Sequence, residues 1–353
     1  MTEPINILEV KDFSVNYGYG DASVRAVSDV SFNLGTSRVL GVAGESGSGK
    51  STLVYGLTRL LRAPGVISGG DVILNIPTDN GVQAFDMLAA TEDDIRSVRW
   101  SNISIVLQSA LSALNPLRRI GREFDEVFRT HDKSMSKADR KARAAELLAM
   151  VGLDANRLDR FPHELSGGQR QRVMIAMALA LEPELVIMDE PTTALDVVTQ
   201  REIVSELYEL RKKLGFAMIF ITHDLSLLVE LADEIMVMYA GHIVERAVAT
   251  ELYNTPRHPY TLGLMNSFPP LHGERKELTG IPGSPPDLKA LPVGCTFSPR
   301  CPYAMDICFT KVPPLSTLES GRLVSCWLHE PSANAAVPVE LSKKSVSSKG
   351  GAQ

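Results

Sequence analysis

The feature that constrains this chain most is the glycine-rich segment at residues 44–51, which reads GESGSGKS. It matches the phosphate-binding loop pattern G-x-x-x-x-G-K-S. An apolar run at 39–43 predicts a buried strand before the segment, and residues 51–61 predict a helix after it. A glycine-rich turn that binds nothing is the alternative, but the strand, the lysine and the helix together favour a phosphate site. The segment therefore predicts an α/β protein that binds a nucleotide.

The chemistry of phosphate binding assigns roles within this loop. Glycines allow backbone N–H groups to close around phosphate oxygens, and the start of the helix adds a partial positive charge. Lys50 can reach the β- and γ-phosphates, and Ser51 is a predicted Mg²⁺ ligand. The predicted nucleotide-binding set of this loop consists of Gly44, Glu45, Ser46, Gly47, Ser48, Gly49, Lys50, Ser51 and Thr52.

A second apolar run, at 185–188, ends in two acidic residues, Asp189 and Glu190. Ligands of parallel sheets bind at the carboxyl ends of the strands, where these side chains would lie. We expect Asp189 to hold Mg²⁺, which prefers oxygen ligands, and Glu190 to polarise the attacking water. Two acids after a strand can also simply cap the next helix. The phosphate loop favours the catalytic interpretation.

A third motif is the run LSGGQ at 165–169, which precedes a predicted helix at 170–181. A serine and two glycines at a helix start can form a second anion site or merely an N-cap with a flexible entry. The three motifs in this order resemble the ATP-binding cassette (ABC) ATPases. In that family two domains pair head to tail, so the resemblance implies that Ser166, Gly167, Gly168 and Gln169 complete the nucleotide site of a partner domain.

The resemblance also implies roles for residues outside the three motifs. Gln108 would contact Mg²⁺ or the attacking water, and His223 would bind the γ-phosphate. Asp196 would lie in the loop that communicates across the dimer. Tyr17 would stack on adenine, although Tyr19 is close by and a core aromatic is an equal alternative.

Hydrophobic patterning predicts how the cassette is organised. Alternating residues at 7–15 and 26–34 predict an N-terminal antiparallel β subdomain, and strand–helix alternation predicts a parallel-sheet core. We expect the ABC ATPase domain to span 1–255, with a helical subdomain at about 92–170. Frequent prolines from residue 255 predict a loop-rich C-terminal extension at 256–332, followed by a disordered tail at 333–353.

Composition excludes several classes of protein. The net charge is −6 and no long basic run is present, which argues against nucleic-acid binding. The longest apolar stretches fall far short of the roughly 20 residues that a membrane-spanning helix needs. The N-terminus lacks the pattern of a secretory signal, so we expect a cytosolic chain without disulfides.

All four cysteines lie near the C-terminus, in the pattern Cys295-x5-Cys301-x6-Cys308-x17-Cys326. Four thiolates in a loop-rich segment suggest a metal site that holds the segment together. The family resemblance implies a [4Fe–4S] cluster. Zinc is the rival, although the usual C-x-x-C spacing is absent, and free buried thiols are the third possibility.

Three features narrow the branch of the family: the run Leu114-Asn115-Pro116, the run RHPYT at 257–261, and the cysteine segment. Together they resemble the ATPase subunits of oligopeptide and dipeptide importers, a branch that also includes importers of oligosaccharides and nickel. The resemblance implies two transmembrane permease subunits, a second ABC ATPase subunit (another copy or a different chain), an extracytoplasmic substrate-binding protein, and a peripheral position on the cytoplasmic face of the inner membrane.

Two other classes are less consistent with the sequence. A soluble ABC ATPase of DNA repair or translation would be expected to have two cassettes or a long coiled coil, whereas this chain has one cassette and no sustained heptads. A non-enzymatic nucleotide-binding regulator would not need Glu190 and His223, which serve catalysis. We therefore expect an ATP-hydrolysing transport subunit.

Overall fold

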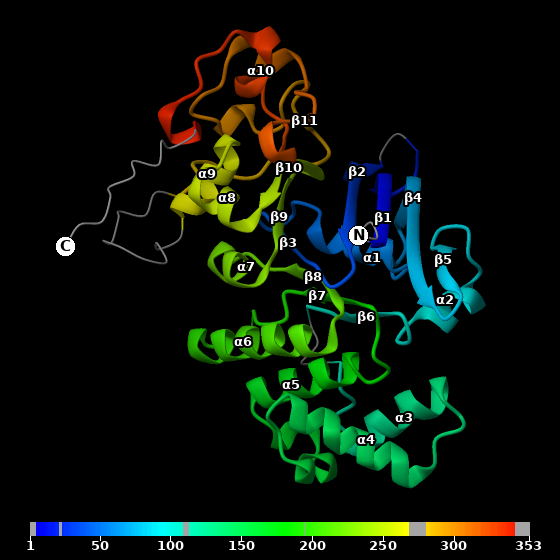
Figure 1. The fold of residues 1–353 in the computed structure, drawn as a ribbon. Helices are drawn as coiled ribbons and strands as arrows, with labels where there is room; N and C mark the ends of the chain where they lie inside the picture. Colours follow the sequence, from blue (N-terminus) through cyan, green and yellow to red (C-terminus); the bar gives the residue numbers. More distant parts are fainter. Residues whose placement is uncertain (1–4, 21–22, 109–112, 194, 268–279, 343–353) are drawn as a thin grey trace, which may run out of the picture.

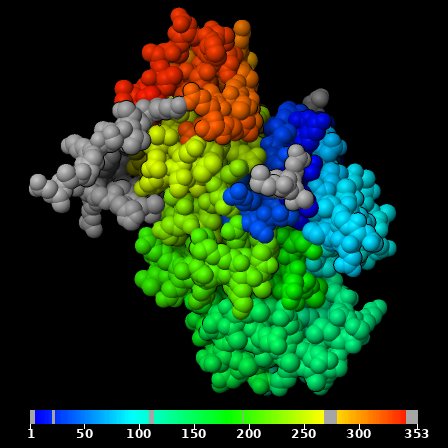
Figure 2. All heavy atoms as spheres, viewed as in Figure 1, coloured from blue at the N-terminus to red at the C-terminus, as the bar shows by residue number. Residues whose placement is uncertain are grey.

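The computed structural model describes residues 5–20, 23–108, 113–193, 195–267 and 280–342, which form two sheets, a group of helices and a C-terminal extension (Figure 1). Among these residues, no helix combines the length and the apolar character that crossing a membrane requires. In the space-filling view the helices of residues 120–178 form a lobe at one end of the molecule, and the extension forms a lobe at the other (Figure 2).

The N-terminal sheet is antiparallel, with the strand order β2-β1-β4-β5. Its strands are β1 (Asn6–Tyr17), β2 (Val24–Gly35), β4 (Gly65–Thr78) and β5 (Gly81–Asp86). Phe13 and Val15 of β1 are completely buried and pack with helix α1 (Lys50–Leu57). The predicted antiparallel subdomain is confirmed.

The main sheet has the order β11-β12-β10-β9-β3-β8-β7-β6 and carries the nucleotide site. Its parallel strands are β6 (Ile103–Val106), β7 (Leu185–Asp189), β8 (Ala217–Ile221), β3 (Val39–Ala43) and β9 (Glu234–Tyr239). Strand β10 (His242–Val248) returns antiparallel to β9 and forms a hairpin with it. Every residue of β3, β7 and β8 is buried, because helices and the N-terminal sheet cover both faces.

The helical subdomain begins later than the sequence predicts. It contains α3 (Ile120–His131), α4 (Lys137–Met150) and α5 (Gly167–Ala178), with short 3₁₀ helices Ala155–Asp159 and Pro162–Glu164 between them. Helix α2 (Glu92–Val98) packs instead on the core of the N-terminal sheet, and β6 pairs with β7 in the main sheet. A four-residue strand inside a helical region gives too little periodicity to be detected.

Three further helices flank the main sheet: α6 (Val197–Leu214), α7 (Leu225–Leu231) and α8 (Ala249–Asn254). Asp196 caps α6 and Gly215 ends it in a left-handed conformation. These caps fix the ends of the crossover between β7 and β8, and so place the residues that follow each strand.

The C-terminal extension consists of short elements, as predicted, but it is joined to the main sheet. Strand β12 (Leu323–Val324) pairs with β10 and with β11 (Ser316–Thr317). The other elements of the extension are α9 (Pro259–Asn266), α10 (Asp306–Thr310) and the 3₁₀ helices Ser298–Arg300, Glu319–Gly321, Trp327–His329, Pro331–Ala333 and Val339–Leu341.

Packed structure continues past residue 333, where the sequence suggests that a disordered tail starts. The Leu341 side chain is buried, and the Leu341 carbonyl accepts a hydrogen bond from Arg257 Nη1 at 2.7 Å. The polar run KKSVSSKGG at 343–351 dominates the composition of the predicted tail, which is why composition indicated disorder here. Residues 343–353 of the predicted tail lie outside the described part of the chain.

Candidate nucleotide and catalytic site

The phosphate-binding loop links β3 to α1, as its motif predicts. Gly44 has a φ of 149°, and a Cβ at this position would lie 2.3 Å from the Met238 carbonyl oxygen. Gly49 has a φ of 100°, and a Cβ there would lie 2.4 Å from the carbonyl oxygen of Ala26. Both positions therefore require glycine, because the loop turns tightly between the two sheets.

Lys50 lies at the start of α1 and is almost fully buried. Its Nζ donates to the carbonyl oxygens of Gly44 at 2.8 Å and Glu45 at 2.9 Å. Burial lowers the pKa of this ammonium group, and the nearby carboxylates of Glu190 and Asp189 oppose that shift. The ammonium group is thus held inside the loop, where it can exchange neutral carbonyl partners for phosphate oxygens.

The two predicted magnesium ligands face each other. Ser51 Oγ donates to Asp189 Oδ1 at 3.1 Å, and Asp189 Oδ2 is buried without a hydrogen-bond partner of normal geometry, although the Tyr55 hydroxyl lies close to this carboxylate. Burial raises the Asp189 pKa. A buried carboxylate oxygen beside a serine hydroxyl suits Mg²⁺, which binds few protein oxygens and takes the rest from phosphate and water. The residues present therefore fit this ion.

Glu190 follows β7 and is the centre of a polar cluster. Its Oε2 accepts hydrogen bonds from Gln108 Nε2 at 3.0 Å and from Thr193 Oγ1 at 2.9 Å, and lies 3.9 Å from His223 Nδ1. Gln108, Glu190 and His223 come from the ends of three neighbouring strands, β6, β7 and β8. The structure therefore brings together the three predicted catalytic residues at one edge of the sheet.

Thr193 is a member of this cluster that no sequence motif predicts. A hydroxyl three residues after Glu190 is a weak signal by itself, because such residues usually satisfy local backbone groups. In this chain it fixes the carboxylate instead, and Glu190 itself has a left-handed backbone with a φ of 46°. A side chain held by two neutral donors can present its other oxygen to water.

The LSGGQ motif begins helix α5. Ser166 Oγ accepts from the Gln169 N–H and Gln169 Oε1 accepts from the Ser166 N–H, both at 3.2 Å. These two bonds form a capping box, so Ser166 is the N-cap of α5. A Cβ on Gly168 would lie 2.7 Å from Thr199 Cγ2, so this glycine lets α5 approach α6 closely.

Asp196 caps α6, one turn before Thr199, the residue that lies against Gly168. Its Oδ1 accepts from the Val198 and Thr199 N–H groups at 3.1 and 3.0 Å, and these bonds hold its pKa below the usual range. The hydrogen bonds of Ser166 and Asp196 described here stay within their own helix starts. Their predicted action on a partner domain remains a prediction.

The two candidate adenine-stacking tyrosines differ in their surroundings. Tyr17 ends β1, and its hydroxyl lies 3.4 Å from Thr52 Oγ1 in α1. Tyr19 is 72% exposed. Tyr17 is thus the one joined to the nucleotide-binding loop, and its stacking role remains a prediction.

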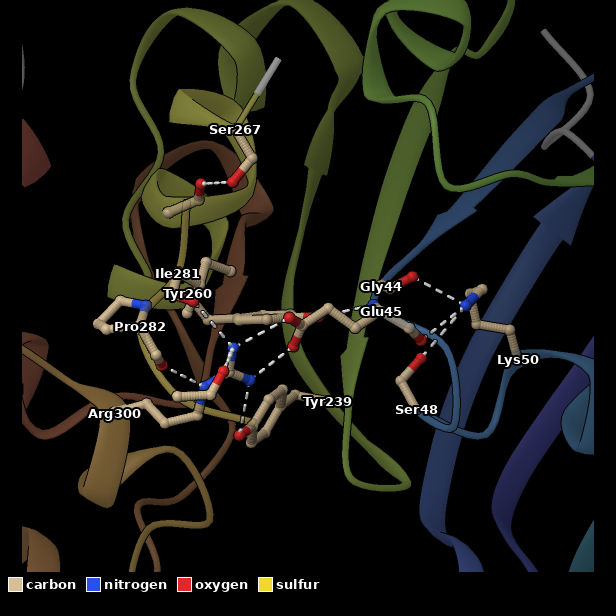
Figure 3. Close-up of polar contacts among 12 residues, drawn as sticks. Gly44, Glu45, Ser48, Lys50, Tyr239, Tyr260, Ser267, Ile281, Pro282 and Arg300 are labelled. Carbon is tan, nitrogen blue, oxygen red and sulfur yellow. Dashed lines mark hydrogen bonds and ion pairs between the residues drawn. The ribbon is translucent and has the colours of Figure 1, made fainter. Parts of the chain in front are cut away.

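The C-terminal extension reaches the same loop, which the sequence analysis does not predict. Arg300 binds the carboxylate of Glu45 through two nitrogens, and the Tyr260 hydroxyl accepts from the Glu45 N–H at 2.7 Å (Figure 3). Arg300 lies 255 positions from Glu45 in the sequence, so no local pattern could reveal the pair.

The four cysteines line one small cavity of about 10 Å³, together with Phe297 and Leu328. None forms a disulfide. Burial raises the pKa of Cys301 to about 11 and of Cys326 to about 12, which keeps both thiols protonated near neutral pH.

This arrangement does not support the predicted metal centre. Among the described residues, no group of three or more histidine, cysteine, aspartate or glutamate side chains is placed to hold a metal ion. The four thiols do reach one cavity, but its volume of about 10 Å³ leaves room for no more than a single small atom among them.

Comparisons with known proteins agree with the fold. A family model described as "ABC transporter" matches residues 27–193, and one described as "Oligopeptide/dipeptide transporter, C-terminal region" matches residues 244–308. The dimeric post-hydrolysis structure of the ATP-binding cassette MJ0796, bound to ADP and Pi, is 28% identical with a TM-score of 0.59, covering 69% of this chain and 98% of that one. The fold and the site thus define an ABC ATPase.

Curated relatives narrow this class. The oligopeptide transport ATP-binding protein OppD of Salmonella typhimurium is 42% identical over 333 residues, which are 92% of this chain and 95% of the relative. The dipeptide transport ATP-binding protein DppD of Escherichia coli is 39% identical over 334 residues, which are 94% and 99% of the two chains. The chain therefore belongs to the ABC transporter family, in the branch of oligopeptide and dipeptide transport ATP-binding subunits, and the predicted resemblance is confirmed.

Proposed function

We propose that this chain is the ATP-hydrolysing subunit of a binding-protein-dependent importer of dipeptides or oligopeptides. The observation that carries the proposal is the cluster in which Glu190 accepts from Gln108 and Thr193 beside His223, next to an intact phosphate-binding loop. Similarity to the peptide-transport relatives extends through the C-terminal extension, which supports peptides as the cargo. Oligosaccharides and nickel are the alternative cargoes of the same machinery.

The residues divide the work of hydrolysis. Backbone N–H groups of the loop and Lys50 bind the phosphates of ATP, and Ser51 and Asp189 would hold Mg²⁺. The ion, when bound, neutralises charge on the phosphates. Glu190 orients the attacking water and accepts its proton, while the Gln108 and Thr193 donors fix the carboxylate. His223, with its side chain 52% exposed, donates to the γ-phosphate.

Transport requires partners that complete this site and use its motion. We propose that a second ABC ATPase subunit, either another copy or a homologous chain, places its LSGGQ motif against the γ-phosphate. Two transmembrane permease subunits would then receive the closing motion near Gln108, and an extracytoplasmic binding protein would deliver the cargo. This arrangement places the chain on the cytoplasmic face of the inner membrane, as a peripheral subunit.

A complementation experiment tests the proposed function. The chromosomal copy of this coding sequence is deleted, and uptake of a radiolabelled tripeptide, a labelled oligosaccharide and ⁶³Ni²⁺ is measured in whole cells. We expect tripeptide uptake to fall and to return with the wild-type chain, but not with Glu190→Gln. Loss of oligosaccharide or nickel uptake alone would assign the alternative cargo, and unchanged uptake of all three would contradict an importer role.

For the four cysteines we propose a structural [4Fe–4S] cluster, with Zn²⁺ as the alternative. The support is that all four thiols line one cavity, and cysteine thiolates are the usual ligands of iron–sulfur clusters and of structural zinc. Holding a cluster would require the cavity to widen and the thiols to lose their protons.

Metal analysis of the full-length chain tests whether the four cysteines bind a metal. Protein purified without oxygen should carry iron and acid-labile sulfide, or zinc, and Cys301→Ser should lose that metal. We expect residues 280–330 to become more sensitive to protease in the variant, because a loop-rich unit of this size has little core of its own. Anaerobic protein that contains neither iron nor zinc would overturn the metal site.

A further inference from the structure

Glu45 of the phosphate-binding loop is held from outside the cassette by the C-terminal extension. Arg300 Nη1 lies 2.7 Å from Glu45 Oε2, and Arg300 Nη2 lies 3.0 Å from Glu45 Oε1. The paired bonds match the planar guanidinium fork to the carboxylate. The Arg300 side chain is only 6% exposed and that of Glu45 is 26% exposed, so water does not screen this ion pair strongly.

Residues of the extension and of strand β9 hold the Arg300 side chain itself. Its Nε donates to the Pro282 carbonyl at 2.8 Å, and its guanidinium lies 5.9 Å from the centre of the Tyr239 ring. Tyr239, Tyr260 and Phe297 form an aromatic group in which ring centres lie 4.6–5.3 Å apart. This packing fixes the guanidinium direction, so Arg300 presents a preformed binding site for one carboxylate.

Tyr260 provides a second attachment, to the backbone rather than the side chain. Its hydroxyl accepts from the Glu45 N–H at 2.7 Å, and the ring is completely buried in α9. The Glu45 carbonyl on the other side accepts from Lys50 Nζ at 2.9 Å. Figure 3 shows Glu45 between Arg300 and Lys50. Any shift of Glu45 therefore moves a direct partner of the phosphate-binding lysine.

We propose that the C-terminal extension fixes the shape of the phosphate-binding loop, and that Arg300, acting through Glu45, is a positioning residue for ATP binding. The side chain of Arg300 does not need to contact ATP to do this. It holds the first variable residue of the loop, while Tyr260 holds the same residue by its N–H group.

Nucleotide binding by the full-length chain tests the inference without depending on any transported cargo. The probe is the non-hydrolysable analogue AMP-PNP with Mg²⁺, titrated by calorimetry. We expect Arg300→Met to weaken binding by about fivefold or more, because the carboxylate loses its paired partner and the loop gains freedom. Glu45→Gln, which keeps the side-chain shape, should weaken binding in the same direction, and Arg300→Lys should recover part of the loss.

The double variant separates positioning from general damage to the fold. If Arg300 acts through Glu45, then Glu45→Gln in the Arg300→Met background should add less than about twofold. The matched control is Arg322→Met, since Arg322 is as buried as Arg300 but lies beside Glu245 rather than the loop.

Three results would overturn the proposal. These are wild-type affinity in both Arg300→Met and Glu45→Gln, additive losses in the double variant, or an equal loss in Arg322→Met. If Arg300→Met fails to fold, the comparison of Glu45→Gln with the wild type decides alone, because this change removes the charge and leaves the extension intact. A binding defect here with peptide uptake unaffected by deletion of the chain would contradict the importer role and leave the positioning role standing.

Discussion

Two glutamates differ in their surroundings: Glu45 belongs to the phosphate-binding loop, and Glu190 lies beside it. Glu190 accepts hydrogen bonds from the neutral donors Gln108 and Thr193, with an exposed histidine nearby. Glu45 is paired with the guanidinium of Arg300, next to the packed rings of Tyr239 and Tyr260. A carboxylate that must take a proton from water cannot be neutralised by a fixed cation, whereas a carboxylate that only holds structure gains from one. Glutamate thus has a proposed catalytic role at position 190 and a proposed structural role at position 45.

The largest effect that tests this comparison is expected from Glu190→Gln. The amide keeps the size of the side chain but cannot accept the proton of the attacking water, so ATP hydrolysis should fall by about 100-fold or more. Binding of AMP-PNP should stay within about twofold of the wild type, because the phosphate contacts are made by other groups. Phosphate release by the assembled transporter and calorimetry of the chain measure the two quantities.

Glu45→Gln is the matched control, since it makes the same chemical change at the other carboxylate. We expect the opposite pattern there: weaker binding, with turnover at saturating ATP much less affected. Hydrolysis by Glu190→Gln at more than about a tenth of the wild-type rate would remove Glu190 as the water-orienting group, because loss of such a group costs at least tenfold.

The next effect concerns the LSGGQ motif. Ser166→Arg should reduce turnover by at least about tenfold while AMP-PNP affinity of the monomer stays nearly unchanged, because a bulky cation blocks closure by a partner domain. The substitution also removes the N-cap of α5, so the control must lose a cap as well. Ser136→Arg does so at the start of α4, where Ser136 Oγ accepts from the Asp139 N–H.

The contrast between these two variants carries the test. Normal turnover in Ser136→Arg with blocked turnover in Ser166→Arg supports the head-to-tail arrangement. Parallel losses of affinity and turnover in Ser166→Arg would instead place the motif in the nucleotide site of its own chain.

The nucleotide edge of the sheet could be predicted from the sequence because phosphate chemistry needs short, contiguous motifs. Lys50, Asp189 and Glu190 each follow or precede a strand that the sequence predicts, so their meeting at one edge follows from parallel topology. The links made by Arg300 and Tyr260 could not be predicted, since they join residues more than 200 positions apart. They depend on how the extension packs, which periodicity does not encode.

The extension illustrates the same limit in its sheet pairing and its cysteines. A two-residue strand such as β12 has no detectable alternation, so its pairing with β10 becomes visible only in the structure. The cysteine spacing predicts a metal site, but spacing does not reveal which other side chains, such as Phe297 and Leu328, line the cavity that the four thiols share. The sequence therefore predicts functional residues that lie in short contiguous motifs. It does not predict contacts between residues that are far apart in the chain.

The smallest expected effect distinguishes the two tyrosines near the nucleotide. Tyr17→Ala should weaken AMP-PNP binding by about three- to tenfold, the range that loss of one aromatic stacking contact allows. Tyr17→Phe should bind as the wild type does, because it removes only the contact between the hydroxyl and Thr52 and keeps the ring. Tyr19→Ala should change affinity by less than about twofold, since its side chain lies mostly in solvent. The reverse order of the two alanine variants would make Tyr19 the stacking residue. Equal and negligible losses would mean that neither ring stacks on adenine and that Tyr17 serves the core between β1 and α1.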